Sequence, residues 1–260
     1  MKISINSPSY MRADGVDTLK YLPECKIWVC ETEVEGYKKA NPDARIVSCK
    51  RGIQGNKCRI LNHILDTEFS KKVDAVAILD DDVQYFGYHE KKKRKKMQPG
   101  YFREWLLKHT ILAQEWGVKV WGVNLNQDKQ SYREYTPFSL TSVILGPFMV
   151  HLPHDVRFDE RFPTKDDYDF SVQILNKYRR ILRLNKFFYV NKMAGSGSGQ
   201  TGGHARIRNL HNEMAQVIGM QKKWGPRIVR LDSGKSRSHS TKKIQNFDIN
   251  PIVKVPIRGV

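Results

Sequence analysis

The sequence predicts an α/β protein that folds as a single domain around a mainly parallel, twisted sheet with flanking helices. The first third of the chain contains four short β-rich runs, at residues 3–6, 26–30, 45–48 and 75–79. Between the last two runs, residues 56–69 place apolar side chains on one face at the 3.6-residue helical repeat. Such strand–helix alternation is typical of doubly wound sheets, and 260 residues are enough for one full core.

The same kinds of pattern continue after residue 98. Pro99 begins a second helix, in which apolar side chains recur at the spacing of a core-facing surface. We then expect, in order, a strand, an apolar run, a helix and a last core strand, at residues 118–125, 142–150, 166 to about 183, and 187–191.

Glycine and serine dominate residues 195–203, which predicts a flexible loop. Such a loop could close over a substrate as a lid, or it could be an exposed connector. A helix is expected to resume near Ala205. Because no repeat or linker divides the chain, we interpret residues 1–218 as one core and residues 219–260 as a basic C-terminal extension.

Basic residues are in large excess, with 45 lysines and arginines against 27 aspartates and glutamates, for a formal net charge of +18. An excess of this size predicts attraction to a polyanion such as nucleic acid, although solubility alone is the alternative. The densest basic run is expected to be a mobile loop, because six adjacent like charges repel one another. Its members are the candidate nucleic-acid contacts: Lys91, Lys92, Lys93, Arg94, Lys95 and Lys96.

Cysteine usage and hydropathy indicate the compartment. Cys25, Cys30, Cys49 and Cys58 form no C-x-x-C pair, which favours free thiols in a reducing environment. No stretch approaches the roughly 18 apolar residues of a membrane span, and the N-terminus lacks the apolar core of a signal peptide. We therefore expect a cytoplasmic protein with no membrane association.

Three consecutive aspartates, Asp80, Asp81 and Asp82, follow the apolar run at residues 76–79 and are the strongest functional signal in the chain. Side chains alternate along a strand, so Asp80 and Asp82 point the same way, about 6–7 Å apart. Like charges packed together are unfavourable unless something neutralises them. A divalent cation with oxygen ligands would do so and would hold a diphosphate in turn. A solvated acidic turn is the alternative.

Further motifs surround the aspartates in a specific order. The chain opens with Ser7-Pro8-Ser9-Tyr10-x-Arg12, and Gly146-Pro147, Phe158-Asp159-Glu160-Arg161-Phe162 and Asp166-Asp167-Tyr168-Asp169-Phe170-Ser171 follow the triplet. Over about residues 1–210 this series resembles the GT-A class of nucleotide-sugar glycosyltransferases, especially its family-2-like members. The resemblance implies a Rossmann-like GT-A fold. It also implies a nucleotide-sugar half at about residues 1–84 and an acceptor half at about residues 99–218.

The resemblance assigns the aspartate triplet to the DxD motif of that class. Asp82, together with His204 and the donor diphosphate, would hold Mn²⁺ or Mg²⁺. Asp80 would face the ribose and Asp81 the donor sugar. The catalytic base would be Asp167, which would take the proton from the acceptor hydroxyl.

Other candidates for binding the donor come from the first half of the chain. Ser7, Tyr10 and Arg12 resemble the first nucleotide-binding loop of the class. Lys57, at the start of the helix over residues 56–69, could contact the nucleotide, or it could belong to a solvated helix face. Glu31, just past the second strand, could receive the base or ribose, with an ordinary surface position as the alternative.

A narrower resemblance is to phage-encoded TET-associated glycosyltransferases, which glycosylate hydroxymethylated pyrimidines in DNA. Small size, basic excess and the lysine-rich run are the features that fit this subgroup. The resemblance implies a UDP-sugar donor, a DNA acceptor and the host cytoplasm as the location. Two alternatives are the same transfer to a glycan or protein, and a non-catalytic nucleic-acid-binding protein on a degenerate transferase scaffold.

Overall fold

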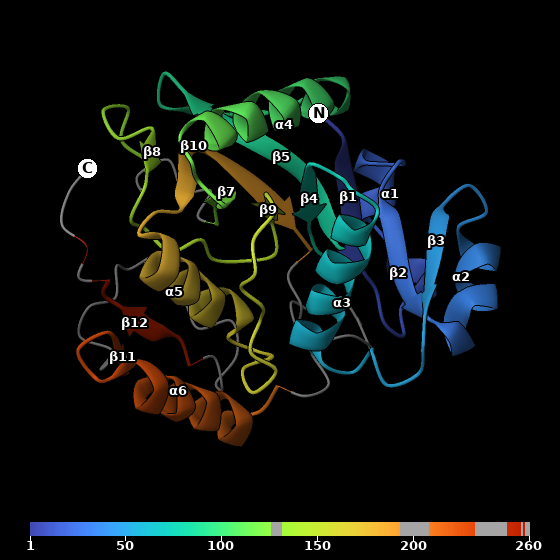
Figure 1. Ribbon diagram of the computed structural model, residues 1–260. Helices are drawn as coiled ribbons and strands as arrows, with labels where there is room; N and C mark the ends of the chain where they lie inside the picture. The colour runs from blue at the N-terminus through green and yellow to red at the C-terminus, as the bar shows by residue number, and fades with distance from the viewer. Residues whose placement is uncertain (126–131, 193–207, 232–248, 256, 258–260) are drawn as a thin grey trace.

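The structure of the protein, a computed structural model, contains one large sheet with helices on both faces (Figure 1). It describes residues 1–125, 132–192, 208–231, 249–255 and 257. Within these residues the sheet has ten strands, which are β1 Ile3–Pro8, β2 Lys26–Cys30, β3 Arg45–Cys49, β4 Ala75–Ile78, β5 Val83–Glu90, β6 Lys93–Lys96, β7 Val120–Asn124, β8 Phe138–Ser139, β9 Met149–His151 and β10 Leu182–Asn191. The strand order is β3-β2-β1-β4-β9-β7-β10-β5-β6, and β8 pairs with β10.

The half of the sheet that contains β1 to β4 is parallel throughout. β1 pairs with β2 and β4, and β2 pairs with β3, so all four strands run in one direction. The carboxyl ends of parallel strands meet at one edge of a sheet, which is where such folds bind ligands. The segments that follow β1, β2 and β4 therefore share this edge, and the aspartate triplet is one of them.

The other half of the sheet mixes directions. β9 is antiparallel to β4 and β7, β10 is parallel to β7, and β5 is antiparallel to β10. Among the described strands of this sheet, only β9, β5 and β8 run opposite to β1. This arrangement confirms the predicted mainly parallel α/β fold in a single domain. Since β5 starts at Val83, the chain passes from the aspartate triplet directly into this half of the sheet.

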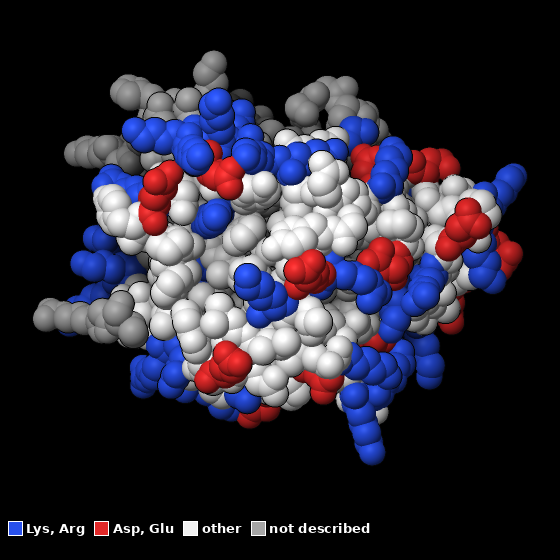
Figure 2. Space-filling model, turned by 90° about the horizontal axis from the view of Figure 1, so that it is seen from above, with Lys and Arg blue, Asp and Glu red and all other residues white. Residues whose placement is uncertain are grey.

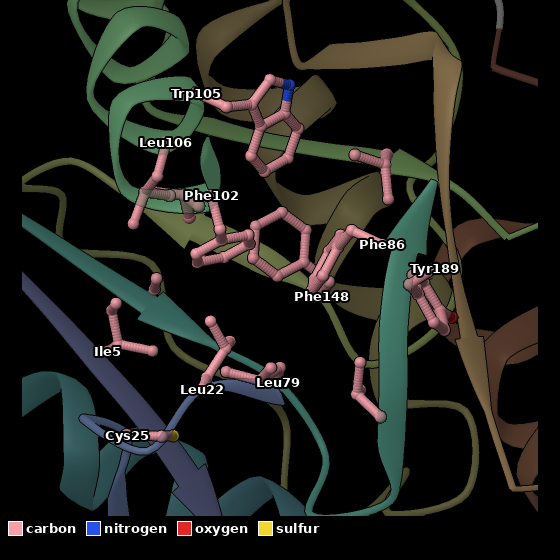
Figure 3. Close-up of a cluster of buried hydrophobic side chains, with 14 of the residues drawn as sticks. Ile5, Leu22, Cys25, Leu79, Phe86, Phe102, Trp105, Leu106, Phe148 and Tyr189 are labelled. Atoms are coloured by element: carbon pink, nitrogen blue, oxygen red, sulfur yellow. The ribbon is translucent and has the colours of Figure 1, made fainter. Parts of the chain in front are cut away.

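Helices cover the two faces of the sheet and enclose two apolar cores. The first core contains Tyr21 of α1 (Thr18–Tyr21), Tyr37 of α2 (Val34–Ala40) and Trp105 of α4 (Pro99–Glu115), and α4 lies above the sheet in Figure 1. The second contains Ile64 of α3 (Lys57–Ser70) and Phe170 of α5 (Asp166–Tyr178), on the opposite face. Aromatic rings fill the first core around Phe86 (Figure 3). Full burial of these large rings stabilises the fold by about 1.5–3 kcal/mol each.

The basic run corrects one prediction, because it forms a hairpin rather than a mobile loop. β6 pairs antiparallel with β5, and Glu90 lies opposite Lys93. Successive strand side chains point to opposite faces, so neighbouring charges are farther apart than their order in the chain suggests. Glu90 also forms an ion pair with Lys95. We expected repulsion among these exposed charges to prevent regular structure. The repulsion is weaker than the backbone hydrogen bonding of the hairpin.

Two further boundaries differ from the sequence prediction. The helix from Asp166 ends at Tyr178 instead of about residue 183, because Arg179 adopts a left-handed conformation with φ 63°. Its backbone N–H donates to the Leu175 carbonyl at 3.0 Å, which closes the last turn. β10 then begins at Leu182, five residues earlier than predicted.

The C-terminal part packs against the start of α5. The helix expected near Ala205 is α6 (Leu210–Trp224), and position 218, our division between core and extension, lies inside it. Glu213 of α6 forms a buried ion pair of 2.5 Å with Lys165, the residue before α5. Two short strands, β11 (Val229–Leu231) and β12 (Pro251–Val253), form a separate small sheet beside α6 (Figure 1). Among the described residues, no helix is both long and apolar enough to cross a bilayer.

Candidate active site

The aspartate triplet lies at the carboxyl edge of the parallel strands, and the segment after β1 folds over it. Asp81 is buried and accepts hydrogen bonds from the Ser9 hydroxyl and from Arg12 at 2.6 Å. Tyr37 fixes the same segment, since its hydroxyl lies 2.8 Å from the Ser9 hydroxyl and accepts from the Arg12 backbone N–H at 3.1 Å. Burial raises the pKa of Asp81 to about 6, although the Arg12 charge opposes the shift. The ion pair between Arg12 and Asp81 joins the segment after β1 to the aspartate triplet.

Asp82 differs from Asp81 because part of its carboxylate has no partner. It is 6% exposed, and its Oδ1 accepts no hydrogen bond from any described residue. Burial, followed by the charges of Asp80 and Asp81, raises the pKa of Asp82 to about 7. A buried oxygen without a donor is unfavourable, and a bound cation would remove that penalty.

Lys57 connects the triplet to the start of α5. Its ammonium lies 3.5 Å from Asp80 and 3.5 Å from Asp166. Burial lowers the pKa of Lys57, but the charges of Asp166, Asp80 and Asp167 outweigh it and raise the pKa above its ordinary value. Lys57 therefore remains charged and holds the aspartate triplet and the start of α5 together. Its position at the start of a helix in the sequence did not reveal this role.

Asp167 lies in the first turn of α5 and is fixed by backbone groups. It accepts from the Gly146 N–H at 2.6 Å and from the Tyr168 N–H at 2.8 Å. Burial and the neighbouring Asp166 charge raise the pKa of Asp167 to about 6, against the effect of these hydrogen bonds. A carboxylate whose pKa lies near neutrality is suited to general base catalysis.

One further side chain in this region, Tyr189, was not predicted from the sequence. Tyr189, on β10, is buried, and its hydroxyl has no hydrogen-bond partner among the described residues. Its surroundings include Asp80, Asp82, Asp166 and Asp167, whose charges contribute, after burial, to raising its pKa well above the ordinary value. The residue occurs in an apolar strand pattern, so no local signal in the sequence marks it.

The remaining candidates are placed less centrally. Ser7 is fully buried on β1 with no partner for its hydroxyl among the described residues, and Tyr10 is half-buried just beyond the strand. Glu31 is exposed and accepts from the Arg51 N–H at 3.0 Å. His204 lies outside the described residues, as does the glycine-rich segment. The six basic candidates, Lys91 to Lys96, are all exposed on the β5–β6 hairpin.

The described residues satisfy part of what a metal site requires. No three His, Cys, Asp or Glu side chains in the described ranges converge as a complete set of ligands. However, Asp82 offers a buried oxygen without a partner, beside two further carboxylates. Hard divalent cations prefer oxygen ligands, and Mg²⁺ is commonly held by one or two carboxylates together with substrate phosphates. These residues therefore fit a cation that shares its coordination with a diphosphate.

Comparison with known proteins agrees with this geometry. None of the curated proteins compared with the chain matches it. The family of TET-associated glycosyltransferases matches residues 3–203, which include every candidate site residue named above except His204. The match covers more than half of the 260 residues. The chain therefore belongs to the TET-associated glycosyltransferase family and is a glycosyltransferase.

Proposed function

We propose that the protein transfers a sugar from a nucleotide-sugar, a UDP-sugar in the first instance, to a hydroxymethylated pyrimidine in DNA. The observation that carries the proposal is the pairing of two acidic groups across Lys57. One is the Asp80–Asp82 triplet, which suits a diphosphate with its cation, and the other includes Asp167, which suits a base. A transferred sugar would lie between the two.

In this proposal Asp167 acts on the acceptor. The hydroxymethyl oxygen of the base forms a bond to the anomeric carbon as the bond from that carbon to the diphosphate oxygen breaks. Asp167 takes the hydroxyl proton, and the electron pair of the broken bond leaves with the nucleoside diphosphate. The Gly146 and Tyr168 N–H groups orient the carboxylate throughout, because they are part of the backbone.

The donor would be held by groups at the carboxyl edge of β1, β2 and β4. We assign Arg12, Ser7 and Tyr10 to the nucleotide side, with Glu31 at the base or ribose. Asp80 and Asp81 are assigned to the ribose and sugar, and Lys57 supplies positive charge beside them. Asp82, with His204, would hold Mn²⁺ or Mg²⁺. When bound, the cation would offset the negative charge on the leaving diphosphate.

Charge supports nucleic acid as the acceptor. Lysine and arginine side chains gather along the margins of the face seen from above (Figure 2), on a chain with a net charge of +18. The turn of the β5–β6 hairpin consists of Lys91 and Lys92, with φ of 48° and 58°. Two-residue turns of this kind favour Asn-Gly, so two lysines there are conformationally unfavourable. A function for their charge, such as phosphate contact, would account for lysines in a turn that disfavours them. The reaction would take place in the cytoplasm, where the four free cysteines stay reduced.

The direct test is transfer to defined DNA. The protein is incubated with Mn²⁺, a panel of UDP-sugars and oligonucleotides containing 5-hydroxymethylcytosine, and the nucleosides are then weighed by mass spectrometry. We expect a gain of one sugar mass on the hydroxymethylated base and none on unmodified cytosine. Labelling of a glycan or protein acceptor under conditions in which no DNA is labelled would reject the DNA acceptor but retain the transferase chemistry.

The hairpin turn provides a specific prediction for DNA affinity. Replacing Lys91→Asn and Lys92→Gly supplies the favoured turn sequence while removing two positive charges. We expect the melting temperature to stay the same or rise. The slope of log affinity against log salt concentration is negative, and it should become less steep by about 2, since each lost phosphate contact removes about 0.9. Fluorescence anisotropy on a labelled duplex at several salt concentrations measures the slope.

The control for this variant removes two lysines far from the hairpin in the sequence. Lys38→Asn with Lys39→Gly makes the same changes at the end of α2, where both side chains are exposed. Its salt slope should remain that of the unaltered protein. An equal change in slope for both variants would show that net charge, rather than the hairpin, attracts DNA.

A further inference from the structure

The hydroxyl of Tyr189 is buried without a partner in an otherwise well-packed region. The side chain is 2% exposed, and its ring lies 6.3 Å from that of Phe86 in the aromatic core. In Figure 3 the oxygen is at the end of the ring that points away from the cluster of Phe86, Phe102 and Phe148. No described residue forms a hydrogen bond with it. A buried hydroxyl without a partner destabilises the folded state, so a phenylalanine here would be the more stable choice.

The backbone next to this hydroxyl leaves room for it because residue 146 is a glycine. A Cβ built on Gly146 would lie only 1.7 Å from the Tyr189 oxygen, so no other residue fits at that position. Gly146 also has φ +87°, a conformation that disfavours side chains. The same glycine donates its N–H to Asp167. The hydroxyl therefore lies directly against the loop that orients the base.

Charges around the hydroxyl determine what it can do. Asp80, Asp82, Asp166 and Asp167 all act on it from two different segments. Negative neighbours and burial both keep the phenol protonated, which makes it a hydrogen-bond donor and not a base. The missing partner is thus an acceptor oxygen that the described part of the chain does not supply.

We propose that Tyr189 donates a hydrogen bond to an oxygen of the sugar that is being transferred. Its hydroxyl lies against Gly146, whose N–H binds the carboxylate that would activate the acceptor, and the charges of the triplet also act on it. The part of a nucleotide-sugar that lies between the diphosphate and the acceptor is the sugar ring, a neutral group rich in oxygen acceptors. Tyr189 is thereby assigned to recognition of the sugar, separate from recognition of the nucleotide. This assignment rests on the proposed function.

The variant Tyr189→Phe tests the assignment because it removes only the oxygen. We expect kcat/KM with the active UDP-sugar to fall about 3- to 15-fold, the effect of one neutral hydrogen bond. Calorimetry in the presence of Mn²⁺ should show the same loss of affinity for the UDP-sugar and no change for UDP. The melting temperature should stay the same or rise, since an unsatisfied buried group has been removed.

The matched control is Tyr21→Phe. Tyr21 is 3% exposed in the same aromatic core, 6.1 Å from Phe86, but its hydroxyl donates to the Met97 carbonyl at 3.0 Å. That variant should lower the melting temperature, because it leaves a carbonyl without its donor, and should leave kcat/KM unchanged.

The possible results distinguish this inference from the proposed function. Unchanged kcat/KM in Tyr189→Phe, a lower melting temperature than the unaltered protein, or an equal loss of affinity for UDP would each overturn the sugar contact. Failure of the unaltered protein to use any UDP-sugar would instead count against the proposed function. The melting temperature can be measured in either case.

Discussion

Replacing Asp167 with asparagine should reduce sugar transfer by about 10²–10⁴-fold, the usual contribution of a positioned general base. The amide keeps the size of the side chain, and its oxygen can still accept from the Gly146 N–H, which lies 2.6 Å from the carboxylate, while the hydrogen bond from the Tyr168 N–H is lost. It cannot accept a proton from the acceptor hydroxyl. Affinity for UDP should therefore be unchanged, and the loss should appear in kcat. Single-turnover kinetics on hydroxymethylated DNA measures the transfer step.

The pH dependence of kcat/KM tests the role of Asp167 independently. Burial and the Asp166 charge raise the pKa of Asp167 to about 6 from its ordinary value near 3.8. A base works only when deprotonated, so kcat/KM at saturating metal should rise with pH through about 6 and level off above it. In Asp167→Asn this acidic limb should be absent from the residual rate.

Asp169 supplies the control on the same helix. Its carboxylate accepts from Lys223 at 2.8 Å and from the Trp224 indole at 2.7 Å, contacts that hold α6 against α5. Asp169→Asn should lower the melting temperature but leave the acidic limb in place. A near-normal rate in Asp167→Asn, or the same loss of rate in both variants, would show that another group is the base.

The fold was predictable because its signals are local. Alternating β-rich and helical patterns identified the parallel half of the sheet, and each predicted strand of that half is present. The hairpin and the end of α5 were missed for a common reason. Both depend on one or two residues in the left-handed region, Arg179 in one case and Lys91 with Lys92 in the other. Neither contains the glycine or asparagine that usually marks such a turn.

The site was predictable only where its residues stand in motifs. The aspartate triplet and Asp167 are recognisable in the sequence, whereas the contacts that tune them are long-range. Lys57 contacts Asp166, which is more than 100 residues later in the chain, and Tyr189 of β10 reaches Gly146 in the loop before β9. Such contacts depend on the packing of the sheet, which local patterns do not specify. The sequence can therefore suggest the reacting groups more readily than the groups that surround them.

Asp82→Asn should abolish metal-dependent binding of the nucleotide, while leaving the fold intact. Asparagine has the same shape but lacks the negative charge that makes the buried Oδ1 of Asp82 an attractive ligand. Loss of a residue that merely orients a ligand typically costs 10- to 100-fold in metal affinity, so loss of a direct ligand should cost at least about that much. Calorimetry with UDP, with Mn²⁺ and again with EDTA, measures the metal-dependent part.

Measurements of the melting temperature test metal-dependent nucleotide binding without relying on turnover. A ligand that binds only the folded state raises the melting temperature, so UDP with Mn²⁺ should stabilise the unaltered protein and EDTA should remove the effect. In Asp82→Asn the shift should disappear. Asp155→Asn, which changes an exposed carboxylate paired with Lys177, should retain it. Since the two variants remove the same charge, a metal-dependent shift that survives in Asp82→Asn would mean that the cation binds elsewhere. The diphosphate would then be anchored by other residues than the triplet.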